Sequence, residues 1–161
     1  MKALFDIDQW KIIEHSFSPK KQEAAESIFS IGNGAFGQRA NFEERYSGKS
    51  LQGSYIGGVY YPDKTKVGWW KNGYPEYFAK VLNSCNWIGI DIEVNGQQLD
   101  LANCEVTSFY RELDMFSGIL SRQFTCSFND GKQIEVESCR FCSMDDDELG
   151  VISYSVKPIN F

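Results

Sequence analysis

The strongest constraint on the fold is an alternating strand pattern that runs into a tight turn. Residues 87–94 alternate large apolar residues with small or polar ones, and Asn95–Gly96 follows directly. Both central residues of a type I′ turn need a positive φ, which Asn and Gly adopt most readily. The return strand begins at Gln97. This segment therefore predicts a β-hairpin.

The sequence predicts a second hairpin just as clearly further along the chain. Residues 120–128 run into the turn 129–131, and residues 132–141 run back. Because side chains alternate between the two faces of a strand, one face of the return strand should be distinct from the other. The first face carries Ile134, Val136, Ser138 and Arg140, and the second carries Glu135, Glu137, Cys139 and Phe141.

The rest of the chain also favours short strands. We expect further strands at 104–115, at 150–156 before Pro158, and at 26–31 and 35–40 around the turn Gly32–Gly34. Several strands with turns about every ten residues indicate a sandwich or a barrel. We predict one all-β domain over residues 1–161, folded as an antiparallel β-sandwich.

A helical turn is predicted at only one place. Residues 20–25 could form it, with Ser18 as the N-cap and Pro19 at the first helical position.

Charge and hydropathy exclude two classes of partner. The net charge is −6, and the only basic doublet, Lys20–Lys21, is followed by Glu23 and Glu26. Nucleic-acid binding needs a basic surface, so we expect none. No stretch approaches the roughly 20 apolar residues that span a bilayer, so we expect no membrane partner. The N-terminus lacks the apolar run of a secretion signal, which favours a cytoplasmic location.

The five cysteines fit no common zinc spacing. Cys139 and Cys142 form a C-x-x-C pattern, but residues three apart on a strand point to opposite faces. Free thiols suit a reducing compartment. We expect no metal site and no cofactor.

The sequence offers no convincing catalytic group. The single histidine, His15, stands alone, and no Gly-x-Ser-x-Gly motif occurs. The glycines of 32–37 resemble a dinucleotide-binding loop, but no helix follows them, so a tight turn between strands is favoured. Three carboxyl groupings are candidates for an acid–base pair. They are Glu43–Glu44, Asp91 with Glu93, and Asp145–Asp147. Solvent-facing alternation and a charged loop explain the last two, and we predict no catalytic residue.

The long connection from Tyr60 to Tyr77 is unusually aromatic, and we expect it to be irregular. Its candidate functional residues are Trp69, Trp70, Lys71, Asn72 and Tyr74. Aromatic faces beside polar groups suit a sugar, which presents apolar C–H faces and hydroxyls. Trp and Tyr are also enriched where one protein surface docks on another. Substrate binding and domain docking are therefore both open for these five residues.

Several segments together resemble the N-terminal domain of glycoside hydrolase family 65. The resemblance is carried by residues 26–44, 53–60, 67–78, 86–90, 113–115 and 130–141. Arg39 and Asn41 stand where this family usually has an Arg-Gly-Asn or Arg-Ala-Asn step. The likeness extends over nearly the whole chain.

The resemblance implies a galactose-mutarotase-like supersandwich, here incomplete, that belongs to an α-glucosyl disaccharide phosphorylase. Such enzymes cleave maltose, kojibiose, trehalose or a related disaccharide with inorganic phosphate, by inversion, to give glucose 1-phosphate. The general acid and the phosphate site belong to a helical barrel that this sequence lacks, so no catalytic residue is carried over. The implied role is to support the barrel of the same parent chain and a homodimer.

Other classes of function stay open at this point. The chain could be a free-standing carbohydrate-binding module. It could also be the same domain of a family 65 hydrolase, such as an α-glucosidase or a trehalase, because the residues that separate hydrolysis from phosphorolysis lie outside it. A mutarotase is less favoured, because one histidine and no acid–base pair leave little to open a sugar ring.

Overall fold

The computed structural model describes residues 5–66, 73 and 75–161. The one helix in this part of the chain is α1 (Gln22–Ile28), and the remaining elements are strands. In the first half these are β1 (Asp6–Ile7), β2 (Lys11–Glu14), β3 (Ile31–Gly32), β4 (Phe36–Gln38), β5 (Ser54–Ile56), β6 (Tyr60–Lys64) and β7 (Tyr77–Val81). The second half holds β8 (Glu93–Val94), β9 (Gln97–Gln98), β10 (Glu105–Asp114), β11 (Ile119–Ser127), β12 (Gln133–Cys142) and β13 (Gly150–Pro158).

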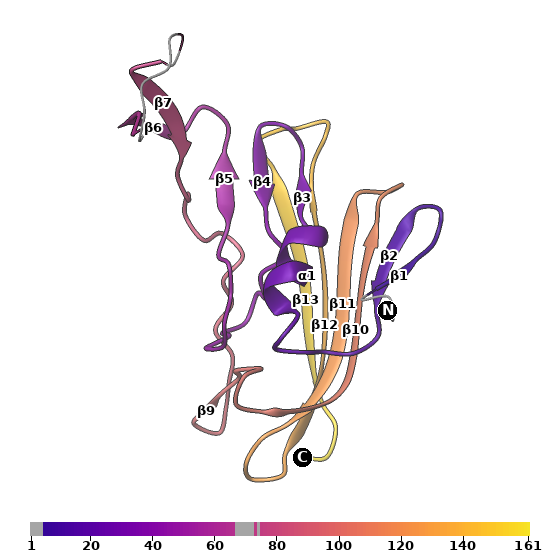
Figure 1. The fold of residues 1–161 in the computed structure, drawn as a ribbon. Helices are drawn as coiled ribbons and strands as arrows, with labels where there is room; N and C mark the ends of the chain where they lie inside the picture. Colours follow the sequence, from indigo (N-terminus) through magenta and orange to yellow (C-terminus); the bar gives the residue numbers. More distant parts are fainter. Residues whose placement is uncertain (1–4, 67–72, 74) are drawn as a thin grey trace.

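A six-stranded main sheet organises the molecule, with the strand order β1-β2-β10-β11-β12-β13 (Figure 1). Every neighbouring pair in it is antiparallel. The long strands β10 to β13 follow one another along the chain and in space, as successive hairpins do. This arrangement confirms the all-β antiparallel fold class.

The inner face of the main sheet is the one that carries the core. The predicted alternation in β12 is confirmed, since Ile134 and Val136 are buried whereas Glu135 and Glu137 are not. The buried apolar residues contributed by the main sheet are Phe109, Leu113, Leu120, Phe124, Cys126, Ile134, Val136 and Cys142. Burial of such side chains contributes about 25 cal/mol for each Å² of apolar surface removed from water, so this face is the main source of stability.

A second layer covers this face. It contains α1, the small sheet β3-β4-β5, and the extended segments around Phe42 and Leu99. Ala25 and Phe29 pack with Leu113 and Leu120, and Phe42 packs with Phe124. Two layers that enclose these buried clusters form the predicted sandwich.

The first predicted hairpin is present, but its strands are short. Asn95 and Gly96 have φ values of 50° and 78°, as a type I′ turn requires. Residues 87–92 lie outside the strands, and the backbone N–H of Ile90 donates to the carbonyl of Glu43 at 2.8 Å and not to a ladder partner. Ile88 is buried, and Ile92 and Val94 pack against the core cluster, so the alternation reports burial in the core.

The expected strand at 26–31 is wrong over most of its length. Residues 22–28 form α1, and only Ile31–Gly32 is a strand. Four positions point to the core, namely Gln22, Ala25, Glu26 and Phe29. Their spacing is helical, but two of them are polar, so the hydropathy pattern concealed the helix. The helix also begins two residues later than predicted, and no side chain caps it.

Candidate docking arm and buried ion network

The predicted site residues Trp69, Trp70, Lys71, Asn72 and Tyr74 lie outside the described residues. The strands on either side of this segment are described. β6 and β7 pair in an antiparallel register that runs from Tyr60 opposite Val81 to Lys64 opposite Tyr77. We call this two-stranded ribbon the arm.

The expectation that residues 60–77 are irregular is therefore wrong at both ends. The ladder continues past β6, because the N–H of Thr65 donates to the Glu76 carbonyl at 2.9 Å. Pro62 lies inside β6 opposite Ala79, a position that a two-stranded ribbon tolerates because only one edge of each strand is paired. The proline and the absence of apolar–polar alternation concealed this hairpin.

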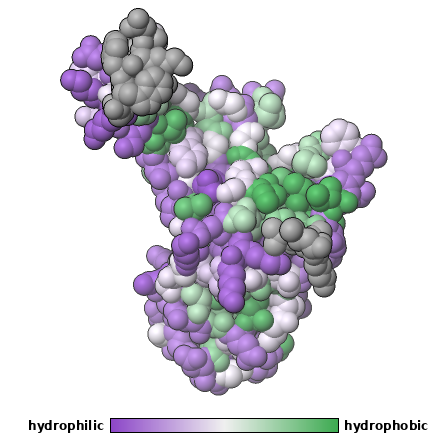
Figure 2. All heavy atoms as spheres, viewed as in Figure 1, coloured by the Kyte–Doolittle hydropathy of each residue, from purple (hydrophilic) through white to green (hydrophobic). Residues whose placement is uncertain are grey.

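The arm projects from the body of the domain (Figure 1). Among the described elements, β6 and β7 pack chiefly against each other. Its large side chains are about half exposed, with Tyr60 at 56%, Tyr61 at 57%, Tyr77 at 51% and Phe78 at 48%. Figure 2 shows the same projection in a space-filling view, and shows hydrophobic residues gathered over the region of β1 and β2 as well. The arm thus presents four half-exposed aromatic side chains.

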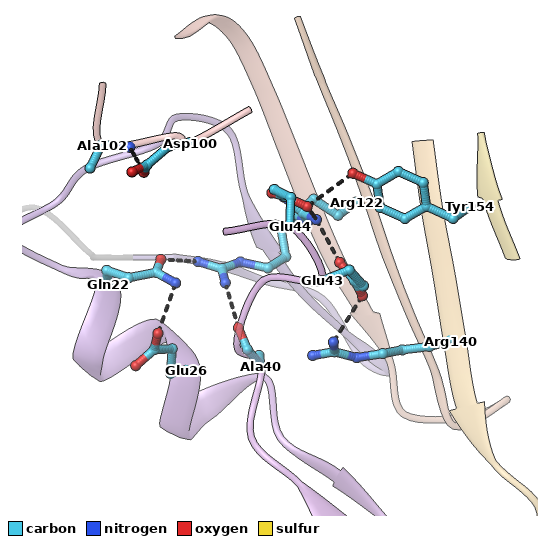
Figure 3. Close-up of polar contacts among 11 residues, drawn as sticks. Gln22, Glu26, Ala40, Glu43, Glu44, Asp100, Ala102, Arg122, Arg140 and Tyr154 are labelled. Carbon is cyan, nitrogen blue, oxygen red and sulfur yellow. Dashed lines mark hydrogen bonds and ion pairs between the residues drawn. The ribbon is translucent and has the colours of Figure 1, made fainter. Parts of the chain in front are cut away.

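The polar residues of the core form an ion network on the inner face of the main sheet (Figure 3). At its centre, Arg122 on β11 donates from Nη2 to Glu43 Oε2 at 2.5 Å and to Glu44 Oε2 at 2.6 Å. Its Nη1 donates to the other oxygen of Glu44. The Tyr154 hydroxyl donates to Glu44 at 3.1 Å. Bidentate guanidinium–carboxylate pairing of this kind is strong and geometrically specific.

Two further arginines on neighbouring strands extend the network. Arg140 on β12 donates to the second oxygen of Glu43 at 2.8 Å. Arg111 on β10 donates to Glu14 at 2.5 Å and to the Ala40 carbonyl at 3.3 Å. These side chains are almost fully buried, where an unpaired charge would be costly. Each guanidinium group therefore lies beside a carboxylate. The network joins the main sheet to the second layer.

This pairing bears on whether Glu43 and Glu44 can act as an acid–base pair. Both carboxylates are buried and held by guanidinium groups, so they are structural anchors. The other carboxyl candidates lie at the surface. Asp91 accepts a hydrogen bond from Gln98 at 3.2 Å, and the exposed residues 145–147 form a loop. His15 is exposed and lies 3.2 Å from Asp6.

The network predicts loss of stability in acid. Burial alone would raise the pKa of Glu43, but the charges of Arg122 and Arg140 outweigh it and hold the pKa below its ordinary value of 4.5. A carboxyl group with a lowered folded-state pKa stabilises the fold above its unfolded-state pKa, and this contribution is lost as the pH falls through the folded-state value. We expect the free energy of unfolding, measured with urea, to be level near neutral pH and to fall below about pH 4.5. A profile that rises on acidification would contradict this.

The Gly32–Gly34 turn is also explained by its contacts. Gly34 has a φ of 92°, which favours glycine. The Asn33 side chain accepts hydrogen bonds from the N–H groups of Ala35 and Phe36, each at 3.0 Å. Its amide nitrogen donates to the carbonyls of Ser143 at 2.7 Å and Asp147 at 3.0 Å. The motif is a turn that fastens the β12–β13 loop, as the sequence favoured over a dinucleotide site.

Replacing Asn33 with alanine should lower the free energy of unfolding by about 1–2 kcal/mol, because the turn and the loop both lose partners. Asn129, an exposed residue in another turn, supplies the control, and Asn129→Ala should change stability by less than about 0.5 kcal/mol. Chemical denaturation of both variants measures the difference. Equal effects at the two sites would contradict the fastening role.

The Arg-Ala-Asn step has a similar structural role. Asn41 is buried, its amide donates to the Leu51 carbonyl at 3.1 Å, and its Oδ1 accepts from the Gly53 N–H at 3.1 Å. Arg39 donates to the Ser27 hydroxyl on α1. The step therefore ties residues 50–53 and the helix to the strand that follows the turn.

The cysteine prediction is confirmed in its geometry. Cys142 is buried on the inner face of β12, whereas Cys139 is half-buried on the other face. Within the ranges that the structure describes, no group of three or more His, Cys, Asp or Glu side chains is placed to hold a metal ion. No helix among the described residues is long and apolar enough to cross a membrane.

Comparison with known proteins places the whole chain in context. The family model for the glycosyl hydrolase family 65 N-terminal domain matches residues 12–161. The chain is 47% identical over 156 residues to maltose phosphorylase of Bacillus subtilis, and 34% identical over 167 residues to α,α-trehalose phosphorylase of Thermoanaerobacter brockii. These alignments cover 97% and 99% of the chain but only 20% and 21% of the relatives.

A solved structure agrees in fold. A putative kojibiose phosphorylase from the human microbiome superposes with a TM-score of 0.81 at 34% identity, over 95% of this chain and 20% of that one. The chain thus spans about a fifth of the length of the relatives it matches. On the family match and the shared sandwich, the chain belongs to the glycosyl hydrolase family 65 N-terminal domain family.

Proposed function

We propose that the chain is the non-catalytic N-terminal domain of an α-glucosyl disaccharide phosphorylase. The parent enzyme would use inorganic phosphate to cleave maltose, or a related disaccharide, with inversion to glucose 1-phosphate and glucose. In this proposal the domain supports the catalytic barrel and a homodimer, and the location is cytoplasmic. The similarity to phosphorylases of maltose, trehalose and kojibiose supports this class of parent.

One observation carries the non-catalytic role. The best-placed pair of carboxyl groups, Glu43 and Glu44, is held by Arg122 and Arg140 inside the core. An inverting glycosidase needs two carboxyl groups about 6.5–9.5 Å apart that flank a substrate cleft, and a phosphorylase needs at least one accessible acid. Buried and paired carboxylates supply neither. This supports a parent enzyme in which the remainder of the chain carries the chemistry.

The direct test is an assay of the parent chain with maltose, kojibiose and trehalose, each with and without inorganic phosphate. The proposal predicts glucose 1-phosphate from one of these disaccharides only when phosphate is present. Cleavage in water alone, with no phosphorylated product, would assign the parent to the hydrolases instead.

A carbohydrate-binding module is the second candidate, and the exposed tyrosines of the arm are the observation that favours it. Titration calorimetry of this chain with the same three sugars separates the two. A support domain should give no heat of binding at millimolar sugar, whereas a module should bind at millimolar concentration or tighter.

A further inference from the structure

The two faces of the arm differ in character. Residues that pair across the ladder point to the same side, and successive residues alternate. One side therefore carries Tyr60 with Val81, Pro62 with Ala79, and Lys64 with Tyr77. We call this the apolar face, since Lys64 is its one charged residue among the described ladder positions. All six residues are exposed, Val81 at 62%.

The other side of the arm is mixed. It carries Tyr61 opposite Lys80, and Asp63 opposite Phe78. The ammonium group of Lys80 lies 3.7 Å from the Asp63 carboxylate, so the charges on this side already have partners within the arm. This side also carries the half-exposed rings of Tyr61 and Phe78, so the two sides differ in charge and not in aromatic content.

An isolated two-stranded ribbon is marginally stable in water, because it has no core of its own. The arm makes no large packing contact with the other described elements, and its apolar face stays open. Tyrosine is enriched at protein contact surfaces, and this face carries Tyr60 and Tyr77. The arm therefore needs a surface to cover it.

The size of the face decides between possible occupants. Five residues at about 3.4 Å each, across two strands, give a footprint on the order of 200 Å². A stable complex between separate molecules buries about 800 Å² on each partner, so two copies that met through this face alone would dissociate. A contact within one chain can be smaller, because the covalent link supplies a high effective concentration. The relatives carry about four-fifths of their length outside the matched region.

We propose that the apolar face of the arm docks on the catalytic domain of the same parent chain, on an apolar surface that presents a carboxylate to Lys64. This inference rests on the proposed function, which supplies the parent chain, and it adds the surface through which the domain is held. The mixed face stays exposed to solvent.

The test compares hydrogen–deuterium exchange at residues 60–64 and 77–81 in the parent chain and in the 161-residue chain. Exchange should be at least tenfold slower in the parent. Val81→Lys on the apolar face should return the parent to the fast rate, whereas Tyr61→Lys, a similarly exposed position on the mixed face, should leave it slow. Melting of both variants in the 161-residue chain checks that neither unfolds the domain.

Each other outcome counts against the inference. Equal rates in the two chains would show that nothing in the parent covers the arm. Slow exchange in the 161-residue chain that depends on its concentration would assign the face to a second copy. Equal effects of the two substitutions would refute the choice of face. Because exchange is measured without substrate, failure here leaves the phosphorolysis assay unaffected, and a parent that does not phosphorolyse sugars could still protect the arm.

Discussion

Replacing Arg122 with methionine should lower the free energy of unfolding by about 3–5 kcal/mol, the usual cost of removing one partner from a buried ion pair. Arg122 lies within 2.6 Å of two carboxylates that water does not reach. Without it, Glu44 keeps only the Tyr154 hydroxyl among the contacts in Figure 3, and Glu43 keeps Arg140. The variant also loses the contacts of the guanidinium with the rings of Phe42 and Phe124, at 4.6 and 5.0 Å.

Urea denaturation at pH 7 measures this effect, and Lys157→Met is its control. Lys157 lies 3.8 Å from Glu135 at the surface, and exposed pairs contribute at most about 1 kcal/mol. If the two substitutions cost the same, the network is not an anchor. If Arg122→Met is stabilising, the desolvation of the ions outweighs their pairing.

Replacing Phe124 with alanine should also be severe, at about 3–5 kcal/mol. Its ring is fully buried between the main sheet and the second layer, so the substitution removes apolar contacts and leaves a cavity. Phe116→Ala is the matched control, because Phe116 is 78% exposed and should change stability by less than about 0.5 kcal/mol. Thermal and urea melts of both variants test this. A small effect at Phe124 would mean that its cluster does not hold the two layers together.

Much of the main sheet could be predicted from the sequence. A strand with one buried face alternates apolar and polar residues with a period of two. The pattern at 132–141 identified the inner face of β12 correctly, including Arg140. Arg140 at an inward position of this strand was the sequence feature that could have indicated a buried ion network. Glu43 and Glu44 could not be assigned as partners, because the approach of the second layer makes their pairing. Glu14 pairs with Arg111 across the neighbouring strands β2 and β10, and the sequence did not predict that register.

The helix and the arm were harder for a related reason. The buried stripe of α1 contains Gln22 and Glu26, and Glu26 is buried because it accepts hydrogen bonds from the Ser50 hydroxyl and the Leu51 N–H, each at 2.6 Å. Hydropathy does not register a polar residue that is buried through tertiary hydrogen bonds. The arm has no buried face within the domain, so its sequence carries no burial pattern with a period of two.

The most direct test of the central claim is the formation of glucose 1-phosphate by this 161-residue chain when maltose and inorganic phosphate are supplied at millimolar concentration. The account predicts no product above the background without protein, while the parent chain turns over under the same conditions. Turnover by the 161-residue chain, at any rate that tracks its concentration, would contradict a non-catalytic domain.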